Sequence, residues 1–132
     1  MLPEGAERRA LVIDDDLPIR QLVTLLMARH GFAVDSVAKA ETALTLLKIN
    51  TYSVILLDLM MPEMNGFDLI EHLSKEQPAM LDRTIVITAF SRHGRPPLVD
   101  ETVYAVIRKP FDIDALFACV EACVTQDEQE DC

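Results

Sequence analysis

The sequence lacks any apolar run that approaches the roughly 18 residues of a membrane-spanning helix. It also lacks an apolar stretch before Asp14 that is long enough for a signal peptide, so we expect a cytoplasmic protein that does not enter a membrane. Basic residues are few: 12 Lys and Arg oppose 22 Asp and Glu, which gives a net charge of −10. This excess of acid argues against direct binding to nucleic acid or to an anionic membrane surface.

Cysteine is scarce as well, with only Cys119, Cys123 and Cys132. An odd number of cysteines, two of them one helical turn apart, does not form a disulfide framework. We do not expect a metal site at these positions. The pattern instead predicts free thiols, as is usual in a reducing cytosol.

Short apolar runs alternate with segments of helical periodicity along the 132 residues, a length that favours a single domain. The runs predict five strands, at residues 10–13, 32–37, 52–57, 84–88 and 103–107. Apolar residues spaced three and four apart predict helices at residues 19–30, 40–47, 67–73 and 113–124. We expect Asp16 to cap the first helix, Pro18 to lie in its first turn and Gly31 to end it.

Strands that alternate with helices predict an α/β fold, in which helices cover both faces of a parallel sheet. Such strands are buried on both sides, which explains the unbroken apolar run at residues 54–57. We place the domain at residues 10–124, after a tail at 1–9 and before an acidic, frayed tail at 125–132. Residues 91–97 hold one Gly and two Pro where a fourth helix should begin. Because interior prolines break helices, we expect that helix to be short, shifted or absent.

Acidic residues follow two of the predicted strands. Asp58 comes directly after the third strand, in VILLDLMMPEMNG, and Asp14 and Asp15 directly follow the first. An unpaired charge buried at such a place would be costly. In parallel sheets, ligands bind beyond the carboxyl ends of the strands, so we expect these acids to form a site there. For Asp16 we favour the simpler role of a helix cap.

The convergence of these carboxylates predicts a metal ion. If the first and third strands are neighbours, two charges about 4 Å apart repel by roughly 4 kcal/mol at an effective dielectric constant of about 20. A bound cation relieves this repulsion. Oxygen ligands without His or Cys indicate magnesium.

Two further strand ends add residues to the same edge of the sheet. The fourth strand ends at Thr88, a hydroxyl, and the small residue Ala89 follows. The fifth strand leads into Lys109. A lone lysine is ordinarily a solvated surface residue, but this one is placed to reach the acids and to hold an anion.

The segments VIDDD, VILLDLMMPEMNG, TA and KPF follow one another as they do in the receiver domain of two-component response regulators. The chain resembles that family over about residues 10–124. The resemblance implies a flavodoxin-like, three-layer fold with the five strands in the order 2-1-3-4-5. It also implies a phosphoacceptor in a phosphorelay rather than an enzyme. Asp58 would receive a phosphoryl group from a phosphohistidine of a sensor histidine kinase or phosphotransfer protein.

The same resemblance implies a role for each residue of the site. Magnesium would be held by the carboxylates of Asp14, Asp15 and Asp58 and by the backbone carbonyl of Met60. The phosphoryl oxygens would be held by Lys109, by the hydroxyl of Thr88 and by the amide of Ala89, whose small side chain leaves room. Family members commonly have a cis peptide bond at the position of Lys109–Pro110.

One position departs from the family pattern. The family often has Tyr or Phe three residues before the lysine, where this chain has Val106. Tyr104 lies two residues earlier, on the same strand face by parity. It is nearer the start of the strand, so we do not expect the usual coupling between the threonine and an aromatic ring to operate unchanged.

Two other functions are compatible with the sequence. The first is a binding module that keeps the fold, ignores phosphorylation and makes contacts through its acidic tail or its altered fourth-helix region. The second is a magnesium-dependent phosphohydrolase with its nucleophile on the first strand. Pro18 stands where such enzymes usually have Thr or a similar residue. A flavin site is not expected, because no phosphate-binding loop rich in Ser, Thr and Gly follows the first strand.

Overall fold

The computed structural model describes residues 8–59, 66–89 and 102–130, with the side chains of 127–130 left aside. The described elements, in chain order, are β1 (Arg8–Ile13), α1 (Leu17–Arg29), β2 (Phe32–Val37), α2 (Ala40–Ile49), β3 (Val54–Leu57), α3 (Gly66–Glu76), the 3-10 helix η1 (Pro78–Arg83), β4 (Thr84–Thr88), β5 (Ala105–Arg108) and α5 (Ile113–Glu130).

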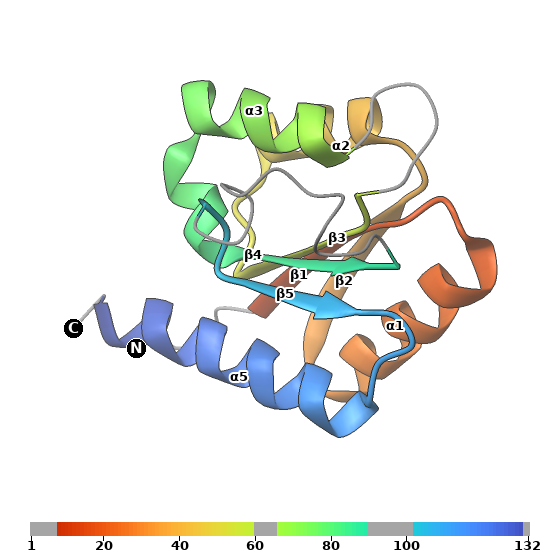
Figure 1. Cartoon of the computed structure of the whole chain (residues 1–132). Coiled ribbons are helices and arrows are strands. Elements are labelled where there is room, and N and C mark those ends of the chain that lie inside the picture. The colour runs from red at the N-terminus through yellow and green to blue at the C-terminus, as the bar shows by residue number, and fades with distance from the viewer. Residues whose placement is uncertain (1–7, 60–65, 90–101, 131–132) are drawn as a thin grey trace.

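The five strands form one parallel sheet in the order β2-β1-β3-β4-β5 (Figure 1). The predicted α/β fold and strand order are therefore confirmed. In this order β1 lies between β2 and β3. The strand order therefore reverses at β1, because β2 is added on one side of it and β3 to β5 are added on the other. The carboxyl ends of β1 and β3 meet at that point.

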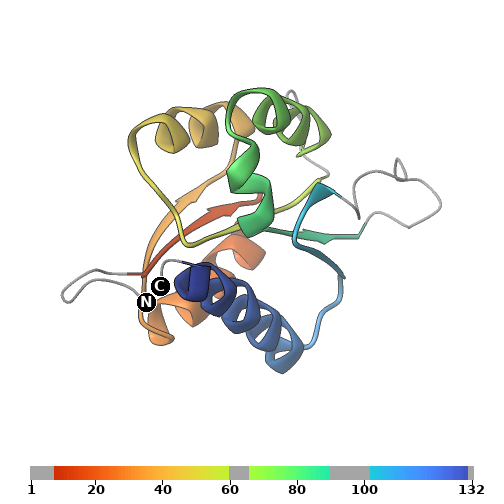
Figure 2. The ribbon, with the colours of Figure 1, turned by 90° about the vertical axis from the view of Figure 1, so that its left-hand side faces the viewer.

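Helices cover both faces of the sheet, α2 and α3 on one and α1 and α5 on the other (Figures 1 and 2). The alternation of side chains along each strand divides the core in two. In β1, Leu11 and Ile13 pack with α2 and α3, whereas Ala10 and Val12 pack with α1 and α5. Burial on both faces explains why the strands read as unbroken apolar runs.

The predicted signals at the ends of α1 are confirmed. Asp16 is the N-cap, and its carboxylate accepts a hydrogen bond from Ile19 N at 3.3 Å. Pro18 lies in the first turn. Gly31 has φ of +90°, a left-handed conformation that ends the helix without strain because glycine has no Cβ.

The first strand and the last helix extend beyond their predicted bounds. β1 begins at Arg8, whose guanidinium pairs with Glu121 on α5 at 3.1 Å. α5 continues to Glu130, since no Gly or Pro interrupts its sequence. β3 and β5 also shift, to Val54–Leu57 and Ala105–Arg108. The prediction for the fourth helix falls on residues 90–101, outside the described residues.

Tyr104 does not share a strand face with Val106, so the prediction from parity is wrong. Tyr104 packs with the core under α1 and α5, whereas Val106 packs with the core under α2 and α3. The reason is that Tyr104 precedes β5 and lies in a bend, where the alternation of a strand does not hold. Burial, followed by the nearby thiols of Cys123 and Cys119, raises the pKa of Tyr104.

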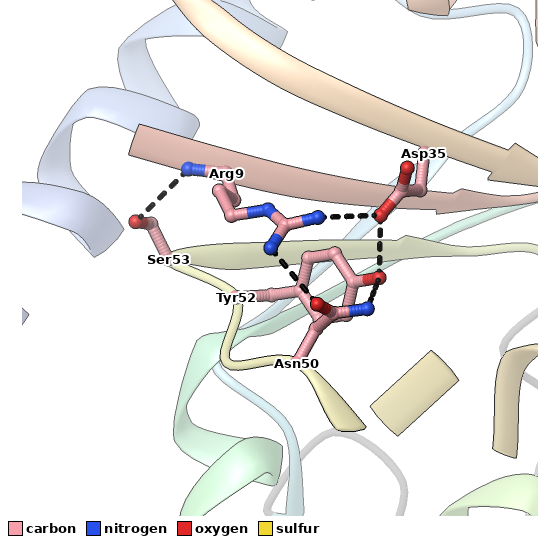
Figure 3. Close-up of polar contacts among 5 residues, drawn as sticks. All are labelled: Arg9, Asp35, Asn50, Tyr52 and Ser53. Atoms are coloured by element: carbon pink, nitrogen blue, oxygen red, sulfur yellow. Dashed lines mark hydrogen bonds and ion pairs between the residues drawn. The ribbon is translucent and has the colours of Figure 1, made fainter. Parts of the chain in front are cut away.

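A polar network ties β1 and β2 to the start of β3 (Figure 3). The guanidinium of Arg9 donates to Asn50 Oδ1 at 2.9 Å and to Asp35 Oδ2 at 3.1 Å. The fully buried Tyr52 donates its hydroxyl to the same Asp35 oxygen at 2.7 Å and accepts from Asn50 Nδ2 at 3.4 Å. Ser53 Oγ accepts from Arg9 N at 3.4 Å. The carboxylate of Asp35, on an edge strand, is thereby paired within the fold.

Tyr104→Phe isolates Tyr52 for titration, since the chain has 2 Tyr and no Trp. Burial, the hydrogen bond to Asp35 and the charge of Asp35 raise the pKa of Tyr52 from 10.0 to about 12. We expect the tyrosinate absorbance of the folded variant to rise near pH 12, and that of the variant in urea to rise near pH 10.

The direction of this shift sets how Tyr52 contributes to stability. Because its pKa is higher in the folded chain, its contribution to the free energy of unfolding is complete below about pH 10 and is lost as the pH rises toward about 12. The control is Tyr52→Phe in the Tyr104→Phe background, which should lack this alkaline loss. Titration of folded Tyr104→Phe near pH 10 would contradict the role given to Asp35.

Candidate functional site

The backbone register brings Asp14 and Asp58 to the same edge of the sheet. Ile13 pairs with Leu57, so the two acids are the next residues of neighbouring parallel strands. Asp58 N donates to Ile13 O at 2.9 Å, and Asp14 N donates to Val37 O at 3.1 Å. The backbone of both acids is therefore held by the sheet.

The predicted acidic cluster is present. Carboxylate oxygens of Asp14, Asp15 and Asp58 all lie within 4.8 Å of one another. Asp14 and Asp58 are 5% and 6% exposed, whereas Asp15 is exposed. A cavity of about 10 Å³ that Asp14 and Asp58 help to line has room for about one water molecule.

This donor set fits magnesium. Three carboxylates offer hard oxygen ligands, and the cluster contains no nitrogen or sulfur donor. The partly exposed position leaves room for the waters that magnesium usually retains. Met60, predicted to add a backbone carbonyl, lies outside the described residues.

Lys109 supplies the positive charge of the site. Its Nζ donates to Asp14 Oδ2 at 3.0 Å and lies 3.8 Å from Asp58 Oδ2. Its backbone N donates to Thr88 O at 2.8 Å, and the peptide bond to Pro110 is cis, as predicted. The ammonium thus offsets part of the repulsion between the two buried acids.

Thr88 and Ala89 also lie at this edge of the sheet. Thr88 is the last residue of β4 and is fully buried. Ala89 follows it and is exposed. β4 lies between β3, which Asp58 follows, and β5, which Lys109 follows. The end of β4 therefore lies between the ends of the strands that lead to those two residues.

Sequence reasoning missed three residues that hold these acids in place. Asp16 N donates to Asp14 Oδ1 at 2.9 Å, in addition to the role of Asp16 as a cap. Arg20 Nη1 donates to Asp14 O at 2.9 Å. Gly66 N donates to Leu59 O at 3.1 Å, directly after Asp58. The Asn65-Gly66 pair before the helix predicted at residues 67–73 indicates a turn rather than this close contact, and the other two contacts have no signal in the sequence.

Gly66→Ala is expected to lower the free energy of unfolding by about 2–3 kcal/mol. An ideal Cβ on Gly66 would lie 2.6 Å from Leu59 Cα and 2.8 Å from Asp58 O, and this backbone cannot move aside as a flexible side chain could. We also expect displacement of the backbone that carries Asp58. Urea unfolding measures the first effect, and the amide chemical shifts of residues 58 and 59 measure the second.

Gly31→Ala is the matched control. Nothing lies within 4 Å of a Cβ at Gly31, but its φ of +90° strains any other residue, so we expect a loss of about 1–2 kcal/mol. This glycine lies before β2, at the other end of the sheet. Its replacement should leave the amide shifts of residues 58 and 59 unchanged. Equal shifts in both variants would show that contact with Gly66 does not position Asp58.

A family model described as the response regulator receiver domain matches residues 10–121. The chain belongs to this family. Receiver domains are signalling modules. In the part of the chain that the structure describes, no helix is both long enough and apolar enough to cross a membrane.

The receiver domain is similar to parts of longer regulatory proteins. It is 29% identical over 122 residues to the response regulator ArlR of Staphylococcus haemolyticus. The aligned region covers 92% of this chain and 54% of ArlR. It is 29% identical over 120 residues to the transcriptional regulatory protein GlrR of Escherichia coli. This aligned region covers 88% of this chain and 26% of GlrR. The chain therefore spans about half the length of ArlR and about a quarter of GlrR.

Solved structures show the same fold. The receiver domain of Francisella response regulator 1452 has a TM-score of 0.81 and 27% identity, over 91% of this chain and 98% of that one. The response regulator TrrA of Thermotoga maritima, solved in complex with Mg²⁺-BeF, has a TM-score of 0.77 and 28% identity, over 88% of this chain and 98% of that one.

Proposed function

We propose that this receiver domain accepts a phosphoryl group on Asp58 in a two-component phosphorelay. The observation that carries the proposal is the convergence of three carboxylates and one ammonium at a single edge of the sheet. A nearly buried carboxylate beside a candidate cation site and a fixed positive charge suits phosphoryl transfer, in which positioning and electrostatics supply most of the catalysis.

The transfer forms one bond and breaks another. A carboxylate oxygen of Asp58 attacks the phosphorus of a phosphohistidine in line with the phosphorus–nitrogen bond. That bond breaks, the imidazole leaves with its electron pair, and an aspartyl phosphate forms. With acetyl phosphate as donor, acetate leaves instead.

Asp14, Asp15 and Asp58 would hold magnesium, with the carbonyl of Met60 as a further proposed ligand. When bound, magnesium neutralises charge on the phosphoryl oxygens and on the acids. Lys109 would leave its hydrogen bond with Asp14 and bind one phosphoryl oxygen. The hydroxyl of Thr88 would bind another, and Ala89 would give its amide and leave space.

The partners that we propose are a sensor histidine kinase or a phosphotransfer protein, and a downstream protein target. We propose no direct contact of this domain with nucleic acid or membrane, and we place the exchange in the cytoplasm. The net charge of −10 supports protein partners over nucleic acid. The complex of TrrA with Mg²⁺-BeF supports magnesium as the ion.

Incubation with acetyl phosphate and magnesium, followed by intact mass measurement, tests the proposal. We expect the mass to rise by one phosphoryl group and to stay unchanged when a chelator removes magnesium. No gain in mass under conditions that phosphorylate another receiver domain would overturn the proposal. That outcome would favour a binding module that does not depend on phosphorylation.

A further inference from the structure

We propose that Arg20 is a positioning residue of the magnesium site, an inference that rests on the proposed function. Arg20 lies one turn into α1. Its guanidinium holds the backbone carbonyl of Asp14, from which the chain continues to Asp15.

Asp14 is held at every polar group. Its N donates to Val37 O at 3.1 Å, and its two carboxylate oxygens accept from Asp16 N at 2.9 Å and Lys109 Nζ at 3.0 Å. The remaining group, the carbonyl oxygen, accepts from Arg20 Nη1 at 2.9 Å. Three of these four bonds come from the sheet or from the site itself, and only the bond from Arg20 comes from a helix.

Asp15 is the acid whose direction depends on that bond. Within the residues that the structure describes, no hydrogen bond or ion pair holds its exposed carboxylate. The carbonyl of Asp14 belongs to the peptide group that joins Asp14 to Asp15. Fixing this carbonyl therefore fixes the plane from which the side chain of Asp15 projects toward the other two acids.

The base of Arg20 is itself well anchored. Arg20 N donates to Asp16 O at 2.9 Å, which is the first backbone hydrogen bond of α1. Arg20 therefore binds the acidic loop at both of its ends, through its guanidinium at Asp14 and through its backbone N at Asp16. Removing the guanidinium should disturb the loop without removing any ligand of the metal.

A purely electrostatic role for Arg20 predicts the opposite effect. A positive charge beside the acids repels a cation, so its removal would tighten magnesium binding. A positioning role predicts weaker binding, because groups that orient metal ligands typically contribute about 10–100-fold to affinity. The sign of the change therefore separates the two roles.

The test measures magnesium affinity by following the amide shifts of residues 14–16 during titration of the full chain. We expect Arg20→Gln to weaken binding about tenfold, and Arg20→Lys, which keeps the charge and a donor, to weaken it less. Arg29→Gln, which removes an exposed charge in the last turn of the same helix, should bind as the parent does. The thermal midpoint without magnesium checks that each variant is folded.

Each outcome decides one question. Tighter binding in Arg20→Gln, or unchanged binding with a lower midpoint, would overturn the positioning role, since charge or fold stability alone would then account for Arg20. If the parent chain binds no magnesium, the proposed function fails, and this inference fails with it. Normal binding by the parent and by both Arg20 variants would overturn the inference alone.

Discussion

Asp58→Asn is expected to gain no phosphoryl group from acetyl phosphate and magnesium, whereas the parent chain gains one. The amide that replaces the carboxylate is neutral and is not a competent nucleophile toward phosphorus. The remaining acids are poorly suited to take its place: both carboxylate oxygens of Asp14 accept hydrogen bonds, and Asp15 is exposed. Intact mass after incubation measures the effect.

Asp16→Asn is the matched control, because it makes the same chemical change in the same acidic loop. Asn caps helices about as well as Asp, so α1 should keep its N-cap. The bond from Asp16 to Asp14 is made by the backbone and should survive. We expect this variant to be phosphorylated as the parent is. Mass gain by Asp58→Asn would mean that another residue is the acceptor.

The sheet was predictable from sequence because its signals are local. The strand at 32–37 and the one at 84–88 were predicted with the bounds that the structure gives. The start of the first strand and the end of the last helix were not predicted correctly. β1 begins at Arg8 and α5 continues to Glu130 through charged and polar residues. The spacing of apolar residues cannot predict these parts, because it gives no signal where the residues are charged.

The site was predictable for a related reason. A parallel sheet places the residues that follow its strands at one edge, so the acids after β1 and β3 and the lysine after β5 converge once the strand order is known. The hydrogen bond from Arg20 to Asp14 O was not predictable. It depends on where α1 sits relative to the loop that precedes it, and a sequence gives the charge of a side chain but not the carbonyl that it meets.

The position of Tyr104 was also not predictable from the sequence. Parity along a strand is a reliable guide only within the strand, and β5 begins one residue later. The aromatic ring therefore packs against α5, away from Val106. The strand β5 itself, Ala105–Arg108, contains no aromatic residue.

Lys109→Gln is expected to change two properties in opposite directions. Phosphoryl uptake from acetyl phosphate should slow by about 100-fold, because the variant loses the charge that would bind a phosphoryl oxygen. Magnesium should bind about tenfold tighter, because the ammonium no longer competes for Asp14 and Asp58, with solvent screening part of the effect. Uptake is measured by intact mass over time, and affinity by the amide shifts of residues 14–16.

Lys75→Gln controls for the loss of a lysine. Its side chain is 71% exposed on α3 and pairs with Glu71 at 3.3 Å, so neither property should change. The opposite signs at Lys109 are what distinguish a phosphoryl-binding group from a structural one. If Lys109 served chiefly to hold the acids in position, its removal would weaken magnesium binding together with phosphoryl uptake. Tighter binding with slower uptake requires that the ammonium acts on the incoming group rather than on the fold.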